Sequence, residues 1–176
     1  MANKFCDLMN IKESLPVREY ATVRVPVGST FYQGDVVELG DLSTTAGEDQ
    51  VYECSAITDA TAVGTYGIVI NQEVEELSDG RRPAGNMDMS TYEYSAGTIL
   101  NVKIFTKNDI FGLTEDCIDG SPEAGKYLIT QDADVNLVVA DNLAGGTTVA
   151  LLIEKAYDQP VGPTFEDAFT ARVVVA

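Results

Sequence analysis

Apolar and polar positions alternate with a period of two in segments near both ends of the chain. In residues 21–27, "ATVRVPV", alanine or valine occupies every second position, with threonine, arginine and proline between them. Residues 169–175, "FTARVVV", follow the same pattern. This alternation is typical of a β-strand with one face on a hydrophobic core. We therefore predict a strand in each segment, with Pro26 at an edge or an end, because proline donates no backbone hydrogen bond.

Further apolar segments lie between these two, and nearly every gap contains the Gly, Asp, Asn or Pro that turns require. They span residues 35–39, 50–57, 66–71, 98–106, 126–130, 136–141 and 148–157. The segment "KYLITQDADVNLVV" reads as a hairpin that turns around residues 131–135. Short strands at this spacing predict an all-β fold: a single compact β-sandwich or barrel-like domain of roughly nine short strands.

The two end segments suggest a pairing. We expect residues 169–175 to be locked into the sheet, either beside residues 21–27 or across a subunit boundary, where they would cover a sheet edge. Direct side-by-side alignment places Arg24 and Arg172 close together, which disfavours that register.

The charge of the chain excludes some partners. Eleven Lys and Arg stand against 28 Asp and Glu, with no His, which gives a net charge of −17. Nucleic acids and anionic membrane surfaces repel such a chain. We predict that neither is a partner, and the charge also favours solubility.

The charge is unevenly distributed, and this singles out the N-terminus. Residues 1–24 carry a net charge of +1, whereas the rest of the chain carries −18. We divide the chain into an N-terminal arm, residues 1–18, and a β domain, residues 19–176. A near-neutral arm meets less repulsion from a partner, so we expect it to dock the protein; the alternative is a plain disordered tail. Its candidate apolar anchors are Phe5, Leu8, Met9 and Ile11.

The longest stretch without a strand pattern, residues 71–91, is a second candidate contact. Loops of this length are usually functional or disordered. It contains Arg81 and Arg82, the one adjacent basic pair in the sequence. We expect this loop to project and to contact a partner, for example a neighbouring subunit.

The three cysteines, Cys6, Cys54 and Cys117, cannot all pair within one chain. The first fifteen residues lack the layout of a signal peptide, and no apolar run approaches membrane-spanning length. These features predict synthesis in a cytoplasm with reduced thiols. Cys54 reads as a small buried residue, and the acidic neighbours of Cys117 are expected to raise its thiol pKa and reduce its reactivity.

Two segments partly match the sequence motifs of ligand-binding loops. "GSPEAGKY", residues 120–127, matches the first seven positions of a phosphate-binding loop, but Tyr127 replaces the hydroxyl residue that holds magnesium, and a strand pattern follows instead of a helix. "DADVN", residues 132–136, begins like a calcium loop but lacks the later Gly and Glu. We interpret both as turns, and predict no catalytic residues, no cofactor and no metal site.

The segments "YQGDVVELGDLS" (32–43), "YGIVIN" (66–71) and "EAGKYLITQDADVNLVV" (123–139), followed by a final apolar strand, form a familiar layout in a short acidic chain. This layout resembles that of the head-decoration and head-fibre-base proteins of tailed bacteriophages, over most of residues 20–176. The likeness lies in layout and turn sequence, so no binding residue is carried over from that family.

The resemblance implies a virion structural protein that binds the outside of an assembled capsid and stabilises or decorates it. It implies the major capsid protein as partner, a homo-oligomer with a trimer favoured, and a further virion protein displayed on the outer face. The chain would be made in the host cytoplasm and located on the capsid exterior.

Other functions stay open. The first alternative is another virion component, such as a tail, baseplate or fibre part. The second is a carbohydrate- or calcium-binding β module, in which tyrosines would replace the missing Trp in sugar stacking. An enzyme is disfavoured, because the chain has no His and no Ser-x-x-Lys or Gly-x-Ser-x-Gly motif.

Overall fold

The computed structural model describes residues 6–11, 20–45, 47, 50–70, 93–143, 147–161 and 164–176. These residues form fourteen β-strands and one turn of 3-10 helix, Glu115–Cys117, which confirms the predicted all-β class. In the described ranges, no helix is long and apolar enough to cross a membrane. The strands are β1 (Cys6–Ile11), β2 (Tyr20–Arg24), β3 (Thr30–Phe31), β4 (Val36–Leu42), β5 (Val51–Ser55), β6 (Thr65–Val69), β7 (Tyr94–Ser95), β8 (Ile99–Ile104), β9 (Asp109–Thr114), β10 (Ile118–Asp119), β11 (Tyr127–Ile129), β12 (Leu137–Ala140), β13 (Ala150–Val161) and β14 (Thr164–Val175).

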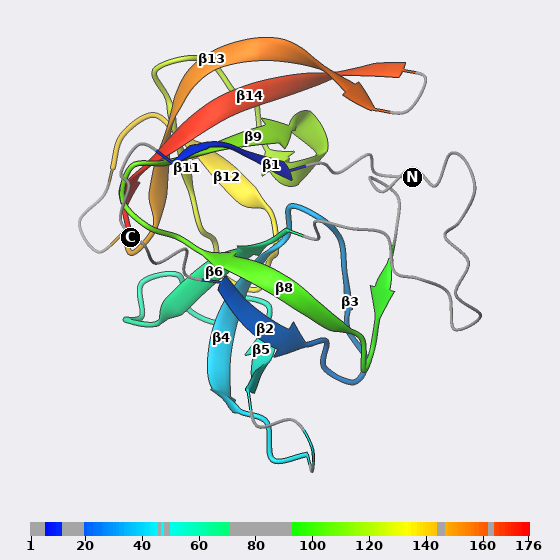
Figure 1. Cartoon of the computed structure of the whole chain (residues 1–176). Helices are drawn as coiled ribbons and strands as arrows, with labels where there is room; N and C mark the ends of the chain where they lie inside the picture. Colours follow the sequence, from blue (N-terminus) through cyan, green and yellow to red (C-terminus); the bar gives the residue numbers. More distant parts are fainter. Residues whose placement is uncertain are drawn as a thin grey trace.

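Five strands close into a barrel in the order β2-β5-β4-β6-β8, the lower part of the molecule in Figure 1. Strand β2 closes it by pairing with β5 in parallel and with β8 antiparallel. The interior is filled by buried apolar side chains, among them Val23, Val37 and Val102. The two-stranded β3–β7 ribbon adds the fully buried Phe31 and Tyr94 to the same core.

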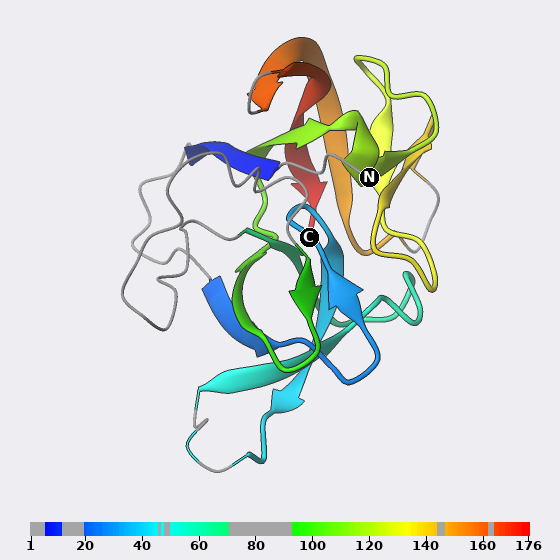
Figure 2. The ribbon, with the colours of Figure 1, turned by 90° about the vertical axis from the view of Figure 1, so that its right-hand side faces the viewer.

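The other large sheet has seven strands in the order β1-β9-β14-β13-β11-β12-β10. It lies above the barrel in Figures 1 and 2, and the long β13–β14 hairpin runs through its middle. The sheet turns a row of apolar side chains inward, including Phe111, Leu151 and Val173. In β14, Phe169, Ala171 and Val173 are buried as the alternation predicts, whereas Thr170, expected on the opposite face, is buried as well.

A shared hydrophobic core joins the barrel to the sheet. Val36 and Ile68 from the barrel belong to the same buried cluster as Phe111 and Leu151 from the sheet. Backbone bonds reinforce the contact. The Val36 N–H donates to the Val135 carbonyl at 2.7 Å, and the Ala133 N–H donates to the Ile57 carbonyl at 2.7 Å. The two parts are therefore packed as one unit.

Residues 169–175 are locked into the sheet as predicted, but they do not pair with residues 21–27. Strand β14 pairs with β13 on one side and β9 on the other, so neither edge is left for β2, which is itself committed to the barrel. Val27, expected on the core face, is 97% exposed, because β2 ends at Arg24 and the chain turns at residues 26–29. Pro26 therefore follows the end of its strand, as predicted.

The strand count exceeds the nine expected. Of the additional strands, β3, β7 and β10 have two residues each, too few to show a period. Strand β9 is buried at all six positions, so its sequence, "DIFGLT", shows no alternation. Buried strands of this kind read as continuous apolar runs, and here Asp109, Gly112 and Thr114 interrupt the run as well.

Candidate interaction surface

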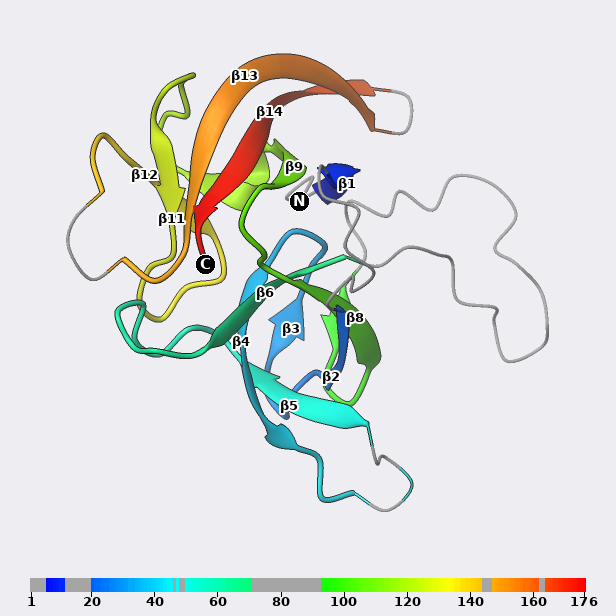
Figure 3. The ribbon, with the colours of Figure 1, turned by 60° about the vertical axis from the view of Figure 1, so that its left-hand side comes forward.

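The β13–β14 hairpin extends beyond the sheet to which it belongs. Neighbouring strands flank only its base, where β14 pairs with β9 over residues 168–172 and β13 pairs with β11 over residues 150–152. Beyond that base, residues 158–161 of β13 and 164–167 of β14 pair only with each other among the described strands. We call these eight residues the hairpin arm. Figures 1 and 3 show the arm projecting past β9 at the end of the molecule away from the barrel.

The arm carries an unusual set of side chains for a sheet extension. Asp158 lies directly opposite Asp167, and Pro160 lies opposite Phe165. Both aspartates are exposed, and Phe165 is 73% exposed. Because side chains two residues apart share a face of a strand, Phe165 and both carboxylates lie on one face of the arm. That face combines an aromatic side chain with two like charges placed together.

The base of the arm is held firmly. Arg172 of β14 forms an ion pair with Glu154 of β13, with the Arg172 Nε donating to Glu154 Oε1 at 2.6 Å. Ile153, Ala171 and Val173 anchor the same part of the hairpin in the buried core. The arm is therefore an extension of a packed hairpin, which limits the entropy that it loses on binding a partner.

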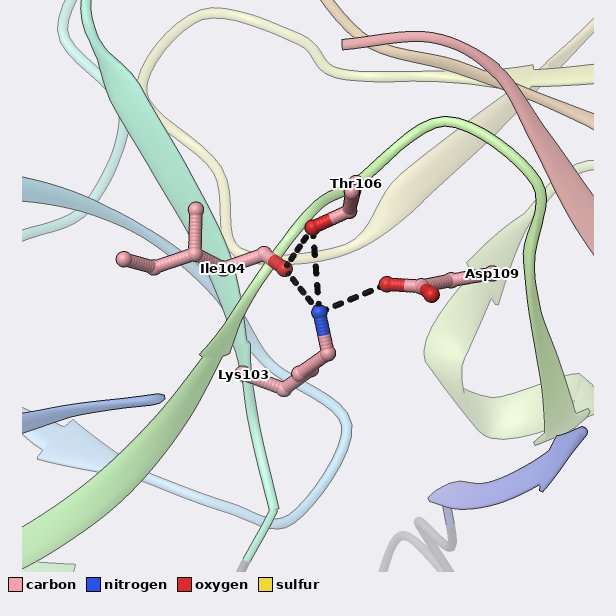
Figure 4. Close-up of polar contacts among 4 residues, drawn as sticks. All are labelled: Lys103, Ile104, Thr106 and Asp109. Atoms are coloured by element: carbon pink, nitrogen blue, oxygen red, sulfur yellow. Dashed lines mark hydrogen bonds and ion pairs between the residues drawn. The ribbon is translucent and has the colours of Figure 1, made fainter. Parts of the chain in front are cut away.

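A buried ion pair fixes the sheet relative to the barrel (Figure 4). Lys103 lies in barrel strand β8 and Asp109 begins β9, and the Lys103 Nζ lies 2.6 Å from Asp109 Oδ2. The two side chains are only 3% and 8% exposed. The same Nζ donates to the Ile104 carbonyl at 2.6 Å and to the Thr106 Oγ1 at 3.2 Å. A charge removed from water needs such partners, so this contact is a structural connection between the two parts.

The structure describes only some of the residues that were predicted to bind a partner. Leu8 and Ile11 lie in β1, paired with Phe111 and Asp109 of β9, and Met9 lies at the β-bulge in the same strand. Strand β1 is an edge strand of the sheet, and its Cys6 carbonyl accepts a hydrogen bond from the Gln33 Nε2 at 2.9 Å. Residues 6–11 of the expected arm are therefore part of the sheet.

The remaining predicted contacts fall outside the described residues: Phe5, Arg81 and Arg82. Strand β9 lies between β1 and β14, so Leu8 and Ile11 belong to a different strand from the two that form the hairpin arm. Sequence reasoning missed the hairpin arm, because residues 158–164, "DQPVGPT", read as a turn between two shorter strands.

The segment that partly matches a phosphate-binding loop is a turn that leads into a strand. Lys126 is followed by β11, and its Nζ pairs with Glu123 Oε2 at 3.4 Å and with Asp141 Oδ1 at 3.6 Å. A phosphate loop requires a helix N-terminus at this point, so the turn interpretation is confirmed.

The segment that begins like a calcium-binding loop is the turn of the predicted β11–β12 hairpin. Asp132 Oδ1 accepts a hydrogen bond from the Ala60 N–H at 2.7 Å, and Asp134 Oδ1 accepts from the Val135 N–H at 2.6 Å. Ala133 between them has a left-handed φ of 58°. Across the part of the chain that the structure describes, no group of three or more Cys, Asp or Glu is placed to hold a metal ion.

All three cysteines are free and buried. Burial raises the pKa of the Cys54 thiol to about 12, and the charge of Glu53 adds to the effect. The Cys54 Sγ donates to the Arg24 carbonyl at 3.2 Å, which fixes the thiol in its protonated form.

We expect Cys54 to resist alkylation in the folded protein. At pH 8 a thiol of this pKa has about a thousandfold less thiolate than an ordinary cysteine, and the thiolate is the reactive form. Iodoacetamide labelling followed by peptide mass spectrometry measures this, with the urea-unfolded chain as control. Labelling of Cys54 at the same rate in both states would contradict the expectation.

Comparison of the chain with protein-family models, curated proteins and solved structures found no match. The function is therefore inferred from the side chains themselves, together with the layout of the sequence. In the described part of the chain, the hairpin arm combines an exposed aromatic side chain with two opposed, exposed carboxylates.

Proposed function

We propose that this chain is a non-catalytic structural protein of a tailed-phage virion that attaches to the outside of the assembled capsid and stabilises or decorates it. The observation that carries the proposal is the hairpin arm, which presents Phe165 on a projecting two-stranded ribbon. An exposed aromatic side chain gains binding energy when another protein covers it, and the packed base of the hairpin holds the arm in place for that contact. The arm is therefore suited to docking.

The charge of the chain supports the same function. A net charge of −17 keeps an exterior protein from adhering to DNA and to other acidic particles. Many copies on a lattice also gain strength from repeated attachment when they are linked as oligomers, even if each contact is weak. In this proposal the major capsid protein is the partner, the chain forms a homo-oligomer, with a trimer favoured, and its outer face displays a further virion protein.

Co-sedimentation tests the proposal. The purified protein is mixed with phage heads that lack it, and separately with purified tails, and each mixture is centrifuged through a sucrose cushion. We expect saturable binding to heads and no binding to tails. Binding to tails alone would assign the chain to the tail, baseplate or fibre, and binding to neither would reject a virion role.

A further inference from the structure

We infer that the hairpin arm docks on a different protein, at an apolar depression edged by Lys or Arg, with Phe165 inside the depression and Asp158 and Asp167 paired with the basic rim. This inference rests on the proposed function and adds the chemistry of the partner surface to it. It is carried by the exposed aromatic and the opposed carboxylates on one face of the arm.

The opposed carboxylates are the first argument. Directly opposite side chains on antiparallel strands have Cβ atoms about 4.5–5.5 Å apart, and like charges at this position destabilise the pair. Asp158 and Asp167 are both exposed, and within the described ranges neither forms an ion pair. A cation from a partner placed between them replaces one repulsion by two attractions. The free protein is therefore preorganised for a basic group.

The aromatic side chain is the second argument. Phe165 shares the face of Asp167 and is 73% exposed at the projecting end of the hairpin. Binding energy in protein interfaces concentrates on aromatic and Arg residues that fill desolvated pockets, and charged groups stay at the rim. An aromatic flanked by carboxylates thus fits an apolar pocket with a basic edge. The same carboxylates disfavour insertion into an anionic lipid surface.

The charge of the chain argues against a second copy as the occupant. A second copy offers a mostly acidic surface to the two carboxylates of the arm, so copies that associate do so through another surface. Lys103, Lys126 and Arg172 form ion pairs with carboxylates of their own chain, which leaves Lys107 and Lys155 as exposed cations of the described ranges. A different protein with a basic surface is the better match.

Binding of arm variants to heads tests the inference, with labelled protein and quantitative co-sedimentation. We expect Phe165→Ala to weaken binding about tenfold or more, because it removes the anchor. Asp167→Asn is expected to weaken binding severalfold and to reduce its sensitivity to salt between about 50 and 300 mM, because one rim contact is lost. The melting temperature of Asp167→Asn should stay unchanged or rise by about 2 °C, because the repulsion with Asp158 is relieved.

Matched controls lie on the barrel. Val63 is fully exposed in the loop between β5 and β6, and Asp41 is exposed near the end of β4, a barrel strand that Figure 3 shows below the β13–β14 hairpin. Val63→Ala and Asp41→Asn remove the same kinds of groups and should bind within about twofold of the unchanged protein, since surface positions outside an interface contribute little.

The outcomes separate the inference from the proposed function. If the unchanged protein binds heads and both arm variants bind equally well, the inference is wrong and the proposed function stands. If the unchanged protein does not bind heads, the proposed function is wrong, and photo-crosslinking from p-benzoylphenylalanine at position 165, in a lysate of producing cells, decides the inference. A crosslink to a segment of another protein that contains Lys or Arg supports it. A crosslink to a second copy, or none, overturns it.

Discussion

Replacing Lys103 with methionine is expected to lower the free energy of unfolding by about 3–5 kcal/mol, the cost of leaving one partner of a buried ion pair alone. Asp109 would keep a carboxylate that is 8% exposed and has lost the Nζ at 2.6 Å. Urea unfolding followed by circular dichroism or tyrosine fluorescence measures the effect, since the chain has eight Tyr and no Trp.

Two further variants separate charge from packing in this prediction. Lys103→Met/Asp109→Leu should recover most of the lost stability, because an apolar pair of similar volume often replaces a buried ion pair without loss. Lys155→Met, at an exposed position of β13, should change stability by less than about 0.5 kcal/mol. Equal losses in the single and double variants would show that packing, and not the unpaired charge, governs the site.

Replacing Gly34 with alanine is expected to lower the free energy of unfolding by about 2–5 kcal/mol, the sum of a left-handed backbone cost and an overpacking cost. Gly34 has a φ of +90°, and a Cβ there would lie 2.5 Å from the Cys117 Sγ. The turn that holds Gly34 connects β3 to β4 of the barrel, whereas Cys117 ends the 3-10 helix after β9. The clash therefore lies at the contact between the barrel and the seven-stranded sheet.

Gly28 provides the matched control, because it has a φ of +85° and a Cβ there would meet no atom within 4 Å. Gly28→Ala should cost only the backbone term, about 1–2 kcal/mol. Adding Cys117→Ala to Gly34→Ala should restore part of the stability by removing the clashing sulfur. The explanation fails if Gly34→Ala and Gly28→Ala cost the same.

The sequence predicted best the strands that have one face on a core. In β2, Ala21 and Val23 are buried and the residues between them are not, as the alternation requires. The β11–β12 hairpin was predicted from its turn residues, and Ala133 adopts the left-handed backbone that such turns use. Local periodicity and turn chemistry depend on neighbours in the chain, so a single sequence contains them.

The candidate site was predicted poorly, for a physical reason. The segment "DQPVGPT" contains the proline and glycine residues of a turn, and only the register of β13 against β14 shows that pairing continues to Val161 and Thr164. The opposition of Asp158 and Asp167 follows from that register. If the register of β13 against β14 were shifted by one residue, Asp158 and Asp167 would lie on opposite faces of the hairpin.

By itself, the sequence determined that the chain is all-β, that particular faces of its strands are buried and that its turns occupy particular places. Only the tertiary structure decided that β2 closes a barrel with β5 and β8, that β14 lies between β13 and β9, and that Lys103 meets Asp109. The alternation of apolar and polar residues along a strand indicates which side chains are buried on folding. Every residue other than proline offers the same backbone donor and acceptor, so the choice of partner strand depends on the packing of the whole chain.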